Sequence, residues 1–302
     1  MPASPPPPAA VRGALAFLAL LAFLLLLPFL AVTGCGRQEG EEPESGRPMV
    51  VVSVAPQAFF VERLAGDRVD IMVLIPPGAS PATHEPSMSE LGAMERARLF
   101  VKVGHPNFPF ERSWLDRLLR ESGPVRVVDC AEGLPVHAED PHIWVGVTAT
   151  RHALPRIATA LIELLPEARS EIEARLSRLI AEIDAVDLEI RAALAGIDQR
   201  RFYVFHAAWG YFAADYGLEQ VPIEIGHKEP DPHRLATIID RARADGVRVI
   251  FVQPQFSRRS AEVIAGEIGG RVVPLDPLAR DWLGNLRDVA AAFRTALEAS
   301  GS

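Results

Sequence analysis

Four side chains of metal-binding type each follow a strand-like run of the sequence. Three are imidazoles and one is a carboxylate, a combination that suits a borderline cation such as zinc. Each of them alone has an ordinary explanation, because a single His is more often a surface or hydrogen-bonded core residue than a ligand, and Asp before Pro is a common turn. Their shared position after strands indicates a joint site. The four candidates are His84, His142, His206 and Asp276.

The elements that must position these residues are short β-branched runs alternating with amphipathic stretches. Near-continuous apolar strands separated by helices indicate an α/β fold with parallel sheets covered on both faces. In the first half we predict strands at 50–55, 69–75, 98–103 and 125–128, with helices near 57–65, 87–96 and 109–121. In the second half we predict strands at 202–205, 220–225, 247–252 and 271–275, with helices near 208–216, 232–245, 258–267 and 284–298.

A highly charged stretch with apolar positions at helical spacing separates the two halves. It begins at Pro166, a residue favoured at the start of a helix, and Gly196 ends it. The simplest architecture is therefore two α/β lobes joined by one long helix. The predicted boundaries are an N-terminal lobe at 49–165, a linking helix at 166–195 and a C-terminal lobe at 196–302.

All four candidate ligands fall in loops at the carboxyl ends of predicted strands. His84 and His142 belong to the first lobe, and His206 and Asp276 to the second. Ligand sites in open parallel sheets form at these strand ends, so the cleft between the lobes is the expected binding place. The spacings alone are weak evidence, because the chain contains nothing resembling HExxH or a paired CxxC.

The first 48 residues resemble an export signal followed by a tether. The apolar run ALAFLALLAFLLLLPFLAV is as long as a short membrane span, and VTGC places small residues directly before Cys35. This resembles the bacterial lipoprotein signal, in which that Cys is lipidated; the alternative is an uncleaved N-terminal anchor. We expect a signal peptide at 1–35, lipidation of Cys35 and a flexible, acidic tether at 36–48. Either alternative places the remainder outside the cytoplasm.

Charge and cysteine content exclude some classes of function. The formal net charge is −8, which gives no electrostatic footprint for nucleic acid and suits a cationic ligand. With Cys35 lipidated, Cys130 is the only remaining Cys, so an internal disulfide is excluded. Cys130 ends a strand-like run and is expected to be a buried apolar residue.

Several longer segments resemble the metal-specific solute-binding proteins of bacterial ABC importers, the zinc and manganese class. The family's DPHIW motif matches DPHIWVGV, and its FH, YF, YGL and KEP elements match FYVFHAAWGYFAADYGLEQVPIEIGHKEPDPHRLATII. Its first and last segments resemble GDRVDIMVLIPPGASPATHEP and VIFVQPQFSRRSAEVIAGEIGGRVVPLDPL. The resemblance covers about residues 49–298 in the same order. It implies two α/β lobes joined by a rigid helix, a metal held between them, and His142 as a ligand.

The first ligand departs from the family pattern. The usual segment reads G-x-x-P-H-x-Y-E-P, and Ala82 stands here at the ligand position, with His84 two residues along the same loop. His105, after the strand at 98–103, is the alternative, although Pro106 restricts its backbone to extended geometry. We favour His84. If neither imidazole coordinates, water would complete a three-ligand site.

The third ligand position distinguishes metals within the family, where a Glu accompanies manganese and a His accompanies zinc. His206 at this position implies zinc (Zn2+) as the transported ion, with manganese (Mn2+) as the alternative. The His-rich and acidic loop that many zinc members carry before DPHIW is nearly missing. Only His137, Glu139 and Asp140 remain of it.

The family resemblance implies a binding protein and not an enzyme. We expect a monomeric extracytoplasmic zinc receptor, held to the membrane by its lipid, that delivers the ion to an ABC permease. A metal-dependent hydrolase is the opposing class, since a catalytic zinc keeps an open position for water. An adhesin or structural lipoprotein would account for the tether but would leave four suitably placed ligands unexplained.

Overall fold

The computed structural model describes residues 46–137, 139–224, 226 and 228–300. The predicted signal peptide, the lipidation site Cys35 and all but the last three residues of the predicted tether lie outside this part. Residues from Gly46 onward form one compact unit. Among the described residues, no helix is both long and apolar enough to cross a membrane.

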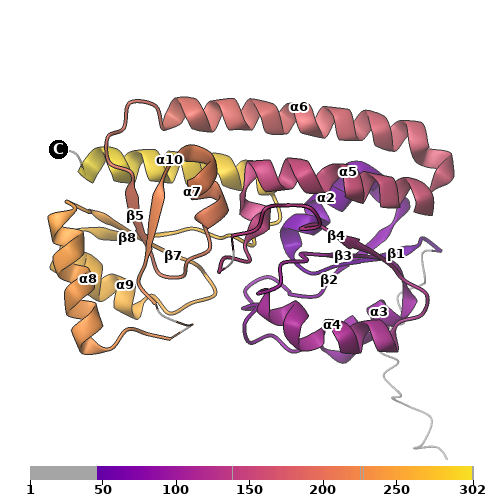
Figure 1. The fold of residues 1–302 in the computed structure, drawn as a ribbon, viewed down its shortest axis with the longest axis horizontal. Helices are drawn as coiled ribbons and strands as arrows, with labels where there is room; N and C mark the ends of the chain where they lie inside the picture. The colour runs from indigo at the N-terminus through magenta and orange to yellow at the C-terminus, as the bar shows by residue number, and fades with distance from the viewer. Residues whose placement is uncertain (1–45, 138, 225, 227, 301–302) are drawn as a thin grey trace, which may run out of the picture. The chain divides into compact units, whose positions relative to one another are not determined.

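The first lobe is a parallel four-stranded sheet in the order β2-β1-β3-β4 (Figure 1). The central strand β1 is the sequence MVVV, whose β-branched side chains favour a strand buried on both faces. Ser87 and Glu90 form a capping box at the start of α3. The strands are β1 (Met49–Val52), β2 (Asp70–Val73), β3 (Ala97–Lys102) and β4 (Arg126–Asp129), and the helices α2 (Ala55–Ala65), α3 (Met88–Arg96) and α4 (Pro109–Glu121).

The second lobe repeats this topology with the strand order β6-β5-β7-β8, all parallel. In each sheet the strand order changes direction at the same place, between the strands that come first and third along the chain. The two halves nevertheless show no alignable sequence repeat. The strands are β5 (Arg201–Val204), β6 (Glu219–Pro222), β7 (Val249–Val252) and β8 (Arg271–Pro274), and the helices α7 (Gly210–Tyr216), α8 (Pro232–Ala244), α9 (Arg259–Glu267) and α10 (Trp282–Ser300). The predicted α/β class with two parallel sheets is confirmed.

The connection between the sheets contains two helices where the sequence predicts one. Helix α6 (Arg169–Ala193) follows a 3-10 turn at Pro166–Ala168 and corresponds to the predicted linking helix. Helix α5 (Val147–Leu164) precedes it and was not predicted. Helix α6 packs on both α5 and α10, as Figure 1 shows. The predicted boundaries at residues 165 and 195 stay predictions.

The larger hydrophobic core is continuous across the two lobes. It contains the first lobe, helices α5, α6, α7 and α10, and one face of the second sheet. Phe202 of β5 and Phe293 of α10 pack at 4.4 Å between ring centroids, while Phe60 of α2 meets Trp282 edge-on at 5.3 Å. A smaller core fills the space between the other face of the second sheet and helices α8 and α9. Shared apolar burial therefore fixes the lobes to the same helical layer.

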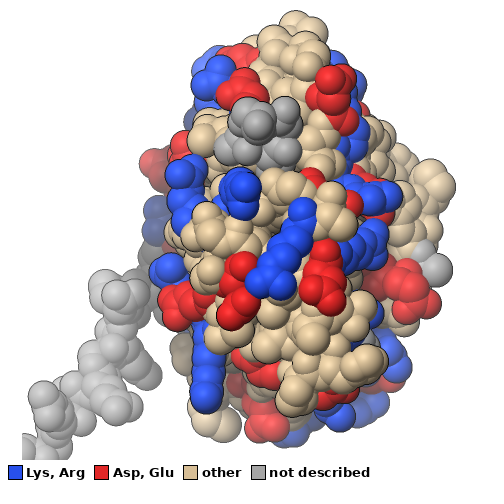
Figure 2. Space-filling model, turned by 90° about the vertical axis from the view of Figure 1, so that its left-hand side faces the viewer, with Lys and Arg blue, Asp and Glu red and all other residues tan. Residues whose placement is uncertain are grey.

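The outward end of the second lobe carries positive and negative side chains interspersed (Figure 2). Ion pairs such as Arg243 with Glu267, at 2.7 Å, link helices α8 and α9 there. Exposed pairs of this kind contribute little to stability. Their mixture of signs produces no single-sign field over this face.

Candidate metal centre

A cavity of about 440 Å³ lies at the carboxyl ends of both sheets. Its polar lining includes His142 from the loop after β4 and His206 from the loop after β5. Its apolar walls include Phe108 and Trp144 of the first lobe and Phe256 of the second. The predicted location of the site, at the strand ends and between the lobes, therefore coincides with a cavity that both lobes line.

The two histidines point at each other across this cavity. The Nε2 atoms of His142 and His206 are 3.2 Å apart, and the rings are nearly perpendicular, at 80°. Two nitrogens bound to one tetrahedral zinc ion at about 2.0–2.1 Å lie about 3.3 Å apart. The rings thus already hold the separation that a shared zinc ion requires.

A carboxylate fixes each ring from behind. Asp140 Oδ1 accepts from the backbone N–H of His142 at 2.9 Å and contacts its Nδ1 at 2.7 Å. Glu224 Oε1 makes the matching contact to Nδ1 of His206. Because an ionised carboxylate can only accept, Nδ1 carries the proton in both rings and the Nε2 lone pairs face the cavity. Carboxylate partners of this kind orient and strengthen metal-binding imidazoles.

Burial and neighbouring groups shift the pKa values of His206 and Asp140. Burial, followed by repulsion from His142, lowers the pKa of His206 below its ordinary value, although Glu224 and Asp140 act in the opposite direction. Burial alone would raise the pKa of Asp140, but its hydrogen bonds and attraction to His142 bring the pKa below the ordinary value. A neutral imidazole can bind zinc without first losing a proton, and an ionised Asp140 can accept from Nδ1 of His142.

The close approach of helix α7 to Asp140 requires a glycine. A Cβ atom on Gly210, the first residue of α7, would lie 2.2 Å from Asp140 Oδ2. With any larger residue here, either the Asp140 carboxylate or the helix would have to move. The start of α7 is therefore part of the support for the site.

Asp276 lies beside the cavity, in the loop that follows β8. Its Oδ1 accepts from Gln255 Nε2 at 2.9 Å and from the backbone N–H of Leu278 at 3.0 Å. Its Oδ2 accepts no hydrogen bond from any residue that the structure describes. The neighbouring Pro277 and Leu278 line the cavity, although Asp276 itself does not.

His84, the predicted first ligand, has another partner in this structure. Its Nε2 lies 3.2 Å from Glu90 Oε2, and its ring stacks on Phe110 at 5.8 Å between centroids. The loop still borders the cavity, through residues 80–82. His84 and the pair formed by His142 and His206 are therefore not brought together here.

His105, the alternative first ligand, is buried and uses both ring nitrogens. Nδ1 accepts from the backbone N–H of Asn107 at 3.0 Å, so Nε2 carries the proton and donates to the carbonyl of His137 at 3.0 Å. Within the described ranges, no three His, Cys, Asp or Glu side chains are grouped closely enough to hold a metal.

The sequence analysis missed the roles of Asp140 and Glu224. Asp140 was noted only as a remnant of a metal-rich loop, although it stands two residues before His142 in the DPH segment. Glu224 lies two residues beyond Pro222, the last residue of β6, and follows the apolar Ile223. Strand β6 lies beside β5 in the sheet. An acid in a buried run at a parallel strand end is the signal that could have identified it, since neighbouring strand ends meet at one edge.

Comparison with known proteins identifies the family. The family model of ZnuA, described as "Zinc-uptake complex component A periplasmic", matches residues 50–296. The chain is 25% identical over 276 residues to the high-affinity zinc uptake system protein ZnuA of Bacillus subtilis, covering 83% of this chain and 85% of that protein. It is also 26% identical over 260 residues to a putative metal-binding protein of Chlamydia trachomatis, covering 82% and 91%.

Solved structures agree with this result. A crystal structure of ZnuA is 38% identical, with a TM-score of 0.79, and the match covers 83% of this chain and 99% of that chain. A zinc-bound ZnuA deletion mutant is also 38% identical, with a TM-score of 0.77 and coverage of 83% and 98%. The predicted resemblance to metal-specific binding proteins is confirmed: the chain belongs to the ZnuA family of periplasmic zinc-uptake components.

Proposed function

We propose that this protein captures zinc outside the cytoplasm and delivers it to an ABC-type permease in the cytoplasmic membrane. The single observation that carries the metal assignment is the pair His142 and His206, with Nε2 atoms 3.2 Å apart and a carboxylate behind each ring. Imidazole nitrogens suit zinc better than they suit a hard cation, which favours oxygen ligands. Manganese is therefore the less favoured cargo.

The proposed ligands are His142, His206 and Asp276, with His84 completing the site. Asp276 Oδ2 has no hydrogen bond within the described chain, so it can bind a cation while Oδ1 keeps its two donors. His84 would have to leave Glu90, and its loop already borders the cavity. His105 is disfavoured because both of its ring nitrogens have partners in the first lobe.

Membership of this family supports a transport role and not the hydrolase alternative. The relatives found are zinc-uptake and metal-binding proteins, and the family is that of periplasmic uptake components. A ligand set drawn from both lobes can surround the ion, whereas a catalytic zinc keeps an open position for water. A closed ligand set of this kind suits capture and release of the ion.

Lipid attachment at Cys35 and a monomeric state belong to the same proposal. The sequence VTGC before the acidic tether supports lipidation. Mass spectrometry of the mature N-terminus would detect the modification, and Cys35→Ser should move the protein from the membrane fraction to the soluble fraction. Retention of the variant in membranes would contradict the lipid anchor. Light scattering of residues 46–302 would give the oligomeric state.

Competitive titration tests the metal assignment. Residues 46–302, which form a compact unit with its own core, are titrated with zinc and with manganese against one chelator at neutral pH. We expect one zinc ion per chain and weaker binding of manganese. Tighter binding of manganese would overturn the choice of metal, and no binding of either ion would overturn the function.

A further inference from the structure

Two buried indoles connect the loops that carry the proposed ligands from opposite lobes. Trp144 and Trp282 are 4% and 2% exposed. Trp144 Nε1 donates to the carbonyl of Pro277 at 2.7 Å, and Trp282 Nε1 donates to the carbonyl of Trp144 at 2.6 Å. We propose that Trp144 is a positioning residue for the metal site, whose N–H places the Asp276 carboxylate relative to His142. This inference rests on the proposed zinc-binding function.

These hydrogen bonds can influence the metal site because they lie close in sequence to two proposed ligands. Trp144 comes two residues after His142, and Pro277 comes directly after Asp276. One hydrogen bond therefore joins the first-lobe loop to the second-lobe loop within two residues of a ligand on each side. The Trp144 ring also meets the His142 ring edge-on, at 5.2 Å between centroids.

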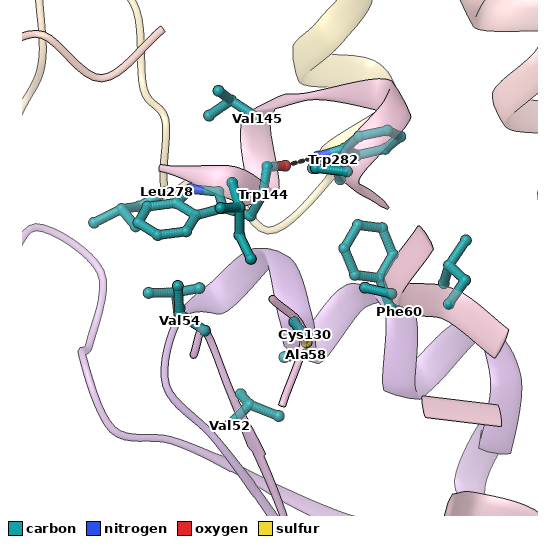
Figure 3. Close-up of a cluster of buried hydrophobic side chains, with 14 of the residues drawn as sticks. Val52, Val54, Ala58, Phe60, Cys130, Trp144, Val145, Leu278 and Trp282 are labelled. Atoms are coloured by element: carbon teal, nitrogen blue, oxygen red, sulfur yellow. Dashed lines mark hydrogen bonds between the residues drawn. The ribbon is translucent and has the colours of Figure 1, made fainter. Parts of the chain in front are cut away.

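Trp282 holds Trp144 in turn. It is the first residue of α10, and its ring packs edge-on against Phe60 of α2 in the first lobe. Figure 3 shows its hydrogen bond to the Trp144 backbone. The indole N–H and the backbone carbonyl of Trp144 are therefore both hydrogen-bonded to residues that follow β8.

The chemistry of indole makes these contacts specific. Nε1–H is a donor only, and a buried indole needs an acceptor in one direction. The carboxylate of Asp276 is oriented within its own lobe by Gln255 and Leu278. The bond from Trp144 adds a directional contact from the first lobe to the residue directly after Asp276.

Trp144→Phe keeps the apolar ring and removes the donor. The matched control is Trp114→Phe, because Trp114 lies on α4, is partly buried and does not line the cavity. We expect Trp144→Phe to lower zinc affinity about 10-fold, the lower end of the effect of losing an outer partner, because its N–H binds the residue next to the ligand. Trp114→Phe should leave the affinity within about twofold. The visible spectrum of the cobalt-loaded protein should change only in Trp144→Phe, because it reports coordination geometry.

A double-mutant cycle with Asp276→Asn separates positioning from general destabilisation. If Trp144 acts through Asp276, adding Trp144→Phe to the Asp276→Asn background should cost little further affinity. Equal losses in both backgrounds, or an equal loss in Trp114→Phe, would overturn the inference. If Trp144→Phe does not fold, Trp282→Phe takes its place in the same cycle. This change removes the hydrogen bond to the Trp144 carbonyl, and its effect on zinc affinity is measured with and without Asp276→Asn. Failure of the proposed function is distinct, because the unmutated protein would then bind no zinc.

Discussion

Asp140→Asn is the sharpest test of how the candidate metal centre is supported. The substitution removes a negative charge and keeps an oxygen that can accept from His142, at the position where Oδ1 now accepts from both the backbone N–H and Nδ1. The ring should therefore stay in place. What changes is the electron donation from the carboxylate to the imidazole, which strengthens the bond from Nε2 to a metal.

The expected loss of zinc affinity is about 10- to 100-fold, or roughly 1.4–2.7 kcal/mol. This range applies because the Asp140 side chain is only 13% exposed, so its charge is poorly screened, and because one of its oxygens makes both contacts to His142. A surface carboxylate should do much less. Asp240, on α8, has a side chain that is 79% exposed and gives a control with the same change in net charge.

The assay is competitive zinc titration of residues 46–302 as the unmutated protein, as Asp140→Asn and as Asp240→Asn. Thermal unfolding without metal is measured alongside to show that each variant folds. Zinc affinity that is unchanged in Asp140→Asn, or reduced equally in Asp240→Asn, would refute the reasoning that this carboxylate acts through His142.

Three further predictions follow from the same structure. His142→Ala and His206→Ala should each weaken the zinc-binding free energy by several kcal/mol, out of the ~10–16 kcal/mol typical of strong zinc sites, with little change in metal-free unfolding. Unchanged zinc affinity in either variant would contradict the proposed ligand set. His84→Ala should weaken zinc binding, whereas His105→Ala should lower the unfolding temperature through its two lost hydrogen bonds; no loss of affinity in either would mean that water completes the site. Burial raises the pKa of Cys130 to about 12, so at pH 8 its thiol should react with a thiol reagent only as fast as residues 46–302 unfold, and rapid labelling of the folded protein would exclude that burial.

Local patterns in the sequence predicted most of the elements. The run MVVV at β1, the capping box of Ser87 and Glu90, and the charged helix after Pro166 depend on side chains within a few residues of each other. Such preferences act whatever the rest of the chain does. Helix α5 escaped prediction because Pro155 lies inside it and because much of its surface is buried, which hides the helical period.

The types of the candidate ligands, and the strand ends on which they lie, were also readable from the sequence. Tertiary structure alone decided which nitrogens face the cavity, through Asp140 and Glu224 behind the two rings. It also gave His84 another partner and joined Trp144 to Pro277 across 133 residues of chain. Sequence patterns report neighbours a few residues apart, whereas distances across a cleft are set by how the two sheets pack on one helical layer, and no local pattern contains that packing.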